Sequence, residues 1–153
     1  MQRILFVCTG NTCRSPMAEA LFRAKAAGSN FEVRSAGVAA FDGQRASDYA
    51  LQVLAERGIL HDHQSRRLNE QLIQWADLIL TMSRGHKDAI HGFYPQAAGK
   101  VYTLTEFANA DPNRDIADPF GGSLYDYQKC AEEIDHLLDR LYQKLIQAHT
   151  RES

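Results

Sequence analysis

RILFVCTGNTCRS, residues 3–15, is the stretch that decides the fold. Its apolar run ends in Cys8 and is typical of a strand buried on both faces of a sheet. Gly10 marks a loop after this strand. Ser15 followed by Pro16 predicts a helix start, with Ser15 as the N-cap. The stretch therefore predicts a strand, a loop and a helix in direct succession.

The rest of the chain continues this alternation. The first helix is expected to end at Gly28. Residues 105–122 contain two prolines, two glycines and three aspartates, so we expect a long loop there. Apolar patterns predict strands at 31–35, 77–82 and 101–104, and helices at 46–57, 69–75, 83–91 and 124–145. This order predicts an α/β fold with a parallel sheet and helices on both faces, as a single domain over 1–153.

Composition excludes several classes of function. The 153 residues carry a net charge of −2, so no global basic field indicates a nucleic-acid partner. No apolar run reaches the roughly 18 residues of a membrane helix, and the opening segment lacks a signal-peptide pattern. Three cysteines do not make a disulfide framework, so a reducing cytoplasm is the expected compartment.

The loop from Cys8 to Ser15 is suited to hold an anion. It leaves a buried strand and enters a helix, so that backbone N–H groups can converge on one ligand. Gly10 allows a tight turn, Asn11 tolerates a left-handed conformation, and the guanidinium of Arg14 matches two phosphate oxygens at once. These residues predict a phosphate-binding loop.

Cys8 is expected to be the nucleophile within this loop. The positive field of the loop should lower the pKa of its thiol, and Ser15 is placed to donate a hydrogen bond to the sulfur. A buried structural thiol and a zinc ligand are the alternatives, but no second pair of metal-ligating residues has finger spacing. The loop therefore predicts a phosphatase that works through a phosphocysteine.

Such chemistry needs a proton donor for the leaving group, and Asp118 is the preferred candidate. Pro119 stiffens the backbone beside it, and Phe120 can form one wall of the entrance. Asp111, which also precedes a proline, and Asp115 are the competing candidates.

The motifs VCTGNTCRSPMAE (7–19), SAGV (35–38) and DPFGGS (118–123) resemble those of the low-molecular-weight protein tyrosine phosphatase family, most closely its bacterial arginine-directed branch. The resemblance implies a four-stranded parallel sheet and no metal or organic cofactor. It makes phosphorylated proteins the expected partners. It implies that Cys8 is the nucleophile, that Arg14 holds the phosphoryl oxygens, and that Asp118 is the acid and later the base. The substrate is expected against Thr9, Gly10, Asn11, Thr12, Cys13, Ser15 and Phe120, and a supporting polar network is expected at Asn11, Ser15, Ser35 and His63.

Thr12 is the informative departure. Phosphotyrosine-specific relatives commonly have isoleucine at this position, whereas arginine-directed relatives have threonine. A short hydroxylated wall favours a polar guanidinium over an aromatic ring, although neutral variation in a tyrosine phosphatase is the alternative.

Two other classes of function share parts of this pattern. An arsenate reductase would need further cysteines on a mobile segment, and residues 76–92 hold none. A phosphate-binding domain without catalysis would be favoured if the nucleophile or the acid were missing.

A disulfide between Cys8 and Cys13 that protects an oxidised nucleophile is a hypothesis that the sequence leaves open.

Overall fold

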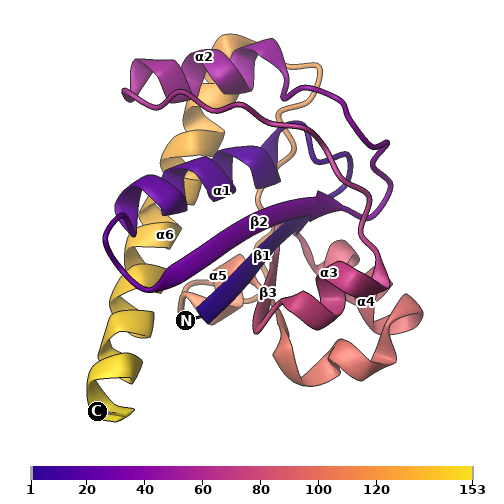
Figure 1. Cartoon of the computed structure of the whole chain (residues 1–153). Helices are drawn as coiled ribbons and strands as arrows, with labels where there is room; N and C mark the ends of the chain where they lie inside the picture. The colour runs from indigo at the N-terminus through magenta and orange to yellow at the C-terminus, as the bar shows by residue number, and fades with distance from the viewer. Residues whose placement is uncertain (1, 153) are drawn as a thin grey trace.

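The computed structural model describes residues 2–152, and of residues 149–152 only the backbone. Four parallel strands form one sheet in the order β2-β1-β3-β4 (Figure 1). The strands are β1 (Gln2–Cys8), β2 (Phe31–Gly37), β3 (Leu78–Thr81) and β4 (Val101–Thr103). The helices are α1 (Arg14–Lys25), α2 (Asp48–Glu56), α3 (Glu70–Trp75), α4 (Arg84–Phe93), the 3-10 helix η1 (Pro95–Lys100), α5 (Leu104–Phe107) and α6 (Leu124–Glu152).

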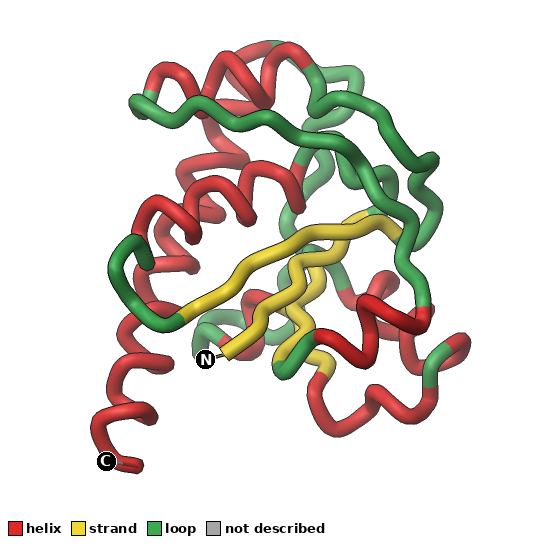
Figure 2. Tube along the Cα trace, viewed as in Figure 1, coloured by secondary structure: helices red, strands yellow, loops and turns green. Residues whose placement is uncertain are grey.

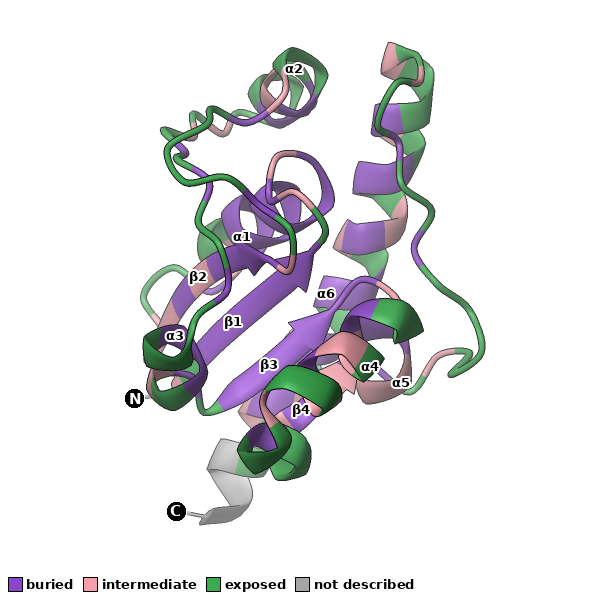
Figure 3. Ribbon diagram, turned by 90° about the vertical axis from the view of Figure 1, so that its right-hand side faces the viewer, coloured by how far each residue is buried: buried purple, intermediate pink, exposed green. Residues whose placement is uncertain are grey.

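Both faces of the sheet are covered by helices. Figure 1 shows α1, α2 and α6 on one side and α3 and α4 on the other. Alternate residues of β1 enter two separate cores: Ile4 and Phe6 pack with α1, α2 and α6, while Leu5 and Val7 pack with α3, α4 and η1. The strands are accordingly buried and the outer faces of the helices exposed (Figure 3). The predicted α/β sheet with helices on both faces is confirmed.

The order of the strands positions the site. The chain leaves β1 for β2 on one side and later crosses to β3 on the other, so β1 lies at the point where the strand order reverses. Ligands of open parallel sheets bind beyond the carboxyl ends of the strands at this switch point. The loop from Cys8 to Ser15 begins there, and the loops around it are drawn in green in Figure 2.

Two predicted details were wrong. Helix α1 begins at Arg14, so Ser15 lies in its first turn and Cys13 occupies the N-cap position without a side-chain cap. Ser15 is engaged instead by Cys8 and Asn11. The expected loop after β4 also contains the short helix α5, where Thr103 and Glu106 form a capping box.

Within residues 2–152, every helix is too short or too polar to span a membrane.

Candidate active site

A cavity of about 400 Å³ lies at the carboxyl end of β1. It is bounded by the loop after β1, by the segment after β2 and by the loop before α6. Its lining residues are Cys8, Thr9, Gly10, Thr12, Cys13, Arg14, Ala39, Ala40, Phe41, Gln44, Asp118 and Phe120. The structure thus brings together the predicted nucleophile, the predicted phosphate-binding arginine and the predicted acid, which are far apart in the sequence.

Cys8 ends β1 and is buried, with its Sγ atom 2.8 Å from the hydroxyl oxygen of Ser15. Burial raises the pKa of the Cys8 thiol above its ordinary value, because it removes water from the thiolate. The hydrogen bond from Ser15 and the charge of Arg14 act in the opposite direction. The expected lowering of this pKa was therefore wrong in its net direction, although the groups expected to lower it are in place.

Asn11 shapes the loop from beneath rather than lining the cavity. Its backbone is left-handed, with φ of 56°, a conformation that asparagine adopts more readily than most residues. Its buried amide nitrogen donates to the hydroxyl oxygens of Ser15 at 2.7 Å and of Ser35 at 2.9 Å. Its amide oxygen accepts from the backbone N–H of Arg66 at 2.9 Å. Asn11 and Ser15 were predicted as substrate-binding residues, and the structure places their side chains in the supporting network.

Two buried residues complete that network. His63 Nε2 lies 2.7 Å from the backbone oxygen of Asn11. The hydroxyl of Ser35 donates to the carboxylate of Glu19 at 2.5 Å. Ser35 and His63 therefore lie where the resemblance implies. Glu19 belongs to the motif of residues 7–19, but the sequence carries no signal that its carboxylate faces β2.

Gly37 explains why the SAGV segment lies so close to the loop. A Cβ atom at this glycine would lie 2.9 Å from the backbone nitrogen of Asn11, closer than real Cβ contacts allow. Its N–H donates to the carbonyl of Arg66, and its carbonyl accepts from the N–H of Leu68, both at 2.9 Å. The glycine thus lets three segments of backbone meet beneath the cavity.

Arg14 joins the loop to the predicted acid. Its side chain is buried, and Nη1 donates to the carbonyl of Ile116 at 2.9 Å. Its Nη2 atom lies 3.6 Å from Oδ2 of Asp118, which is half-exposed. The other carboxylate oxygen of Asp118 accepts from the N–H of Phe120 at 3.1 Å. These contacts hold the acid at the mouth of the cavity.

The two competing aspartates are engaged elsewhere. Asp111 accepts from the N–H of Asn113 within a turn. Asp115 accepts from the backbone N–H of Arg84 and pairs with its side chain at 3.3 Å. Of the three candidates, Asp118 is the one that lines the cavity.

His86 is a residue of this site that the sequence did not single out for it. It lies on α4, buried, with Nε2 2.8 Å from the hydroxyl of Thr9 and Nδ1 2.9 Å from the hydroxyl of Ser83. Arg14 Nη2 lies 3.5 Å from the same hydroxyl of Thr9. Burial and the charge of Arg14 lower the pKa of His86 to about 4, so the ring is neutral at neutral pH.

This pKa predicts a dependence of stability on pH. Well above pH 6.5, the ordinary pKa of histidine, the ring is neutral in both the folded and the unfolded chain. As the pH falls toward 4, the unfolded chain takes up a proton that the folded chain refuses, so the free energy of unfolding decreases. Between pH 7.5 and 5, urea titration should show the wild type losing about 1–2 kcal/mol more than His86→Asn. An equal loss in both proteins would contradict this assignment.

The rim of the cavity carries two exposed aromatic side chains. Phe41 and Phe120 are 73% and 75% exposed and line the cavity from the segment after β2 and from the acid loop. Phe120 was predicted at the entrance, and Phe41 was not. Thr12, half-buried, lines the cavity from the loop that carries Cys8.

The three cysteines are free thiols. Cys13 lies 3.3 Å from the hydroxyl of Tyr127, and burial raises the pKa of Cys130 to about 12. A thiol with so high a pKa is a poor relay for disulfide exchange, in keeping with the rejection of an arsenate reductase. A disulfide between Cys8 and Cys13 remains a hypothesis.

Comparison with known proteins identifies one family model over nearly the whole chain. The model described as low molecular weight phosphotyrosine protein phosphatase matches residues 3–151. Among curated proteins, a protein-arginine-phosphatase of Geobacillus stearothermophilus is 49% identical over 94% of this chain and 95% of its own. A protein-arginine-phosphatase of Bacillus subtilis (strain 168) is 44% identical over 93% of this chain and 95% of its own.

Solved structures are similar over the same range. The YwlE arginine phosphatase from Geobacillus stearothermophilus has a TM-score of 0.96 and 46% identity, covering 100% of this chain and 98% of that one. A cysteine-to-serine mutant of a YwlE arginine phosphatase, with a phosphorylated active-site serine, has a TM-score of 0.90 and 43% identity over 94% of this chain and 95% of that one.

Proposed function

Because the chain belongs to the low-molecular-weight phosphotyrosine protein phosphatase family, we propose that it hydrolyses phosphoarginine in proteins through a phosphocysteine intermediate. One observation carries the proposal: the Cys8 thiol lies in the same cavity as Asp118, whose carboxylate is 3.6 Å from Arg14. Nucleophile, phosphate ligand and acid therefore face one small volume.

In the first step the thiolate of Cys8 attacks phosphorus and the P–N bond breaks. Asp118 gives its proton to the departing guanidino nitrogen, which takes the electron pair of the P–N bond, so that the arginine side chain leaves with this nitrogen protonated. Loss of the thiol proton is favoured by the Ser15 hydroxyl and by the Arg14 charge, which oppose the effect of burial on its pKa. The products are a free arginine side chain and a phosphocysteine.

In the second step a water molecule attacks the phosphocysteine and the S–P bond breaks. Asp118, now ionised, accepts a proton from the water, and the leaving thiolate returns to the contacts it made before. Inorganic phosphate is released. The same carboxylate serves both steps because it lies at the mouth of the cavity and is half-exposed.

The loop stabilises the charge that develops in the transition state of each step. In phosphoryl transfer the transition state spreads charge over three equatorial oxygens. Arg14 offers its guanidinium, and α1 begins at this loop without a capping side chain or an acidic residue in its first turn. The helix dipole at this N-terminus favours an anion, and the backbone N–H of Ser15 donates a hydrogen bond to the Cys8 sulfur.

Arginine rather than tyrosine specificity is supported by Thr12 and by the names of the relatives. Thr12 lines the cavity with a short hydroxylated side chain. The exposed carboxylate of Asp118 can also pair with the guanidinium of the substrate.

Replacing Thr12 by isoleucine should move the preference from phosphoarginine toward phosphotyrosine. The larger apolar wall gives an aromatic ring more contact and removes a hydroxyl from the neighbourhood of a polar guanidinium. A change of this size is worth about 1–3 kcal/mol, so the ratio of the two kcat/KM values should shift by roughly 10–200-fold. Paired phosphoarginine and phosphotyrosine peptides of the same sequence measure this ratio.

Thr12→Val is the matched control, since it removes the hydroxyl and leaves the size unchanged. It should reduce turnover of phosphoarginine without gaining turnover of phosphotyrosine. Equal or greater wild-type turnover of phosphotyrosine peptides would overturn the specificity and leave the phosphatase activity standing. No turnover of these peptides or of a generic aryl phosphate, with phosphate still bound, would indicate a binding domain instead.

A further inference from the structure

A second group of chemically active side chains lies behind the catalytic loop. Glu19 of α1 meets His61 and His63, which lie on residues 57–69, the connection between α2 and α3. One potential ligand atom from each residue lies within 4.8 Å of the other two. The sequence carried no signal of this cluster, because the carboxylate and the histidines come from separate elements.

His61 is the member of this cluster that the fold leaves unexplained. Its side chain is 5% exposed, and its buried Nε2 atom has no hydrogen-bond partner among the described residues. That nitrogen lies 3.8 Å from Oε2 of Glu19. The ring stacks on His63 with centroids 5.3 Å apart and planes 28° from parallel. A buried polar atom without a partner costs free energy, and a ligand would remove this cost.

We propose that Glu19, His61 and His63 bind a divalent transition-metal cation of the Zn²⁺ class. Two imidazoles and a carboxylate form a donor set that suits Zn²⁺ and disfavours Mg²⁺, which prefers oxygen ligands alone. Bonds of about 2.1 Å in a tetrahedral site place ligand atoms about 3.4 Å apart. The three side chains must therefore draw together when the cation binds.

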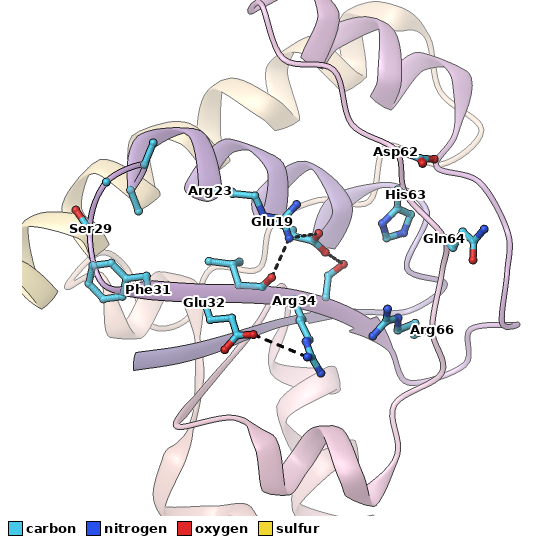
Figure 4. A pocket seen from close by; sticks show the side chains of 15 residues that line it. Glu19, Arg23, Ser29, Phe31, Glu32, Arg34, Asp62, His63, Gln64 and Arg66 are labelled. Carbon is cyan, nitrogen blue, oxygen red and sulfur yellow. Dashed lines mark hydrogen bonds and ion pairs between the residues drawn. The ribbon is translucent and has the colours of Figure 1, made fainter. Parts of the chain in front are cut away.

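The surroundings allow this movement. Glu19 and His63 line a cavity of about 660 Å³, and Figure 4 shows Glu19 on α1 and the His63 ring on the adjacent loop. A water molecule in this cavity would supply the fourth ligand. Arg23 pairs with Glu19 at 2.8 Å and donates to the carbonyl of Val33 at 2.9 Å. Its side chain is 54% exposed, so it can turn toward solvent as the cation takes its place.

The site is connected to the catalytic loop through two of its ligands. Glu19 accepts the hydrogen bond of Ser35, which in turn accepts from Asn11, and His63 lies 2.7 Å from the backbone oxygen of Asn11. Movement of these ligands toward a cation lengthens both contacts and loosens the left-handed turn at Asn11. This part of the inference rests on the proposed function: the bound cation should reduce phosphatase activity reversibly.

Binding is tested without catalysis in the Cys8→Ser protein, which removes the thiolate of the nucleophile as a competing ligand for the metal. Calorimetry with Zn²⁺ should show one site, and adding His61→Leu should weaken binding at least about tenfold. His91→Leu is the matched control, because His91 also has a buried Nε2 without a partner among the described residues and is absent from the cluster. It should leave binding unchanged. Equal Zn²⁺ affinity with and without His61 would overturn the site.

Activity is then compared in proteins that keep Cys8. Zn²⁺ should inhibit the wild type and His91→Leu, with recovery after chelation, while His61→Leu should keep its basal activity and need at least about tenfold more Zn²⁺ for the same inhibition. Equal inhibition of all three proteins would place the effect elsewhere and overturn the coupling. If no protein hydrolyses the substrate, the proposed function fails, and the calorimetry still decides the metal site.

Discussion

Cys8→Ser should reduce turnover of phosphoarginine peptides by about 10⁴-fold or more. A serine hydroxyl ionises far less readily than a thiol, so the first step loses its nucleophile. An alkoxide is also a poorer leaving group than a thiolate, so any phosphate that reaches the serine should stay there. Steady-state kinetics measures the loss, and intact-protein mass spectrometry after long incubation with substrate should detect the phosphorylated serine.

Cys130→Ser is the control for this substitution. Cys130 is also a buried free thiol, but it lies on α6 outside the cavity, with its Sγ atom 3.8 Å from the carbonyl of Ala117. Its replacement should leave turnover within a few-fold of the wild type. Activity that survives Cys8→Ser, or that depends equally on both cysteines, would contradict the covalent mechanism.

Asp118→Asn should lower kcat by about 10²–10⁴-fold. The amide is nearly the same size and can still accept from the N–H of Phe120, but it can neither give a proton to the leaving nitrogen nor take one from water. The first step should recover with an aryl phosphate whose leaving group needs no proton. The second step should stay slow with every substrate. Rapid quenching with the aryl phosphate should therefore capture more phosphocysteine than in the wild type.

Asp115→Asn tests whether this loss is specific to the acid. Asp115 lies on the same loop and pairs with Arg84 outside the cavity. Its replacement should change stability slightly and kcat by no more than a few-fold. A loss at Asp115 as large as that at Asp118 would refute the assignment of the proton donor.

The fold could be predicted because strands and helices leave signals in neighbouring residues of the sequence. Alternation of apolar runs with helix signals was enough to predict every strand of the sheet. The helix ranges predicted at 69–75 and 83–91 correspond to α3 and α4, which Asn69 and Ser83 cap. Ser15 misled the prediction, since a serine before a proline has the pattern of a cap. Its hydroxyl instead contacts Cys8 and Asn11. The serine–proline pattern gives no information on these contacts.

The site likewise contains residues that the sequence predicted and residues that it did not. Cys8, Arg14 and Asp118 were predicted because their motifs carry the chemistry in adjacent residues. Glu19 and His86 were not predicted as parts of the site, because their roles depend on contacts with Ser35 and Thr9 that lie far from them in the sequence. The pKa of Cys8 could not be judged either, since burial, which a sequence does not give, is the strongest influence on it.

The left-handed turn at Asn11 has a consequence for protein engineering. Its conformation depends on Ser35 and Gly37 of β2 and on His63 and Arg66 of the connection that follows α2. Eight residues grafted onto a foreign scaffold would carry the reacting sulfur and the guanidinium without the partners that fold them around a phosphate. The smallest transferable unit is thus the sheet with its crossovers. A design that copies the motif alone transfers the reactive side chains without the residues that hold the loop in its conformation.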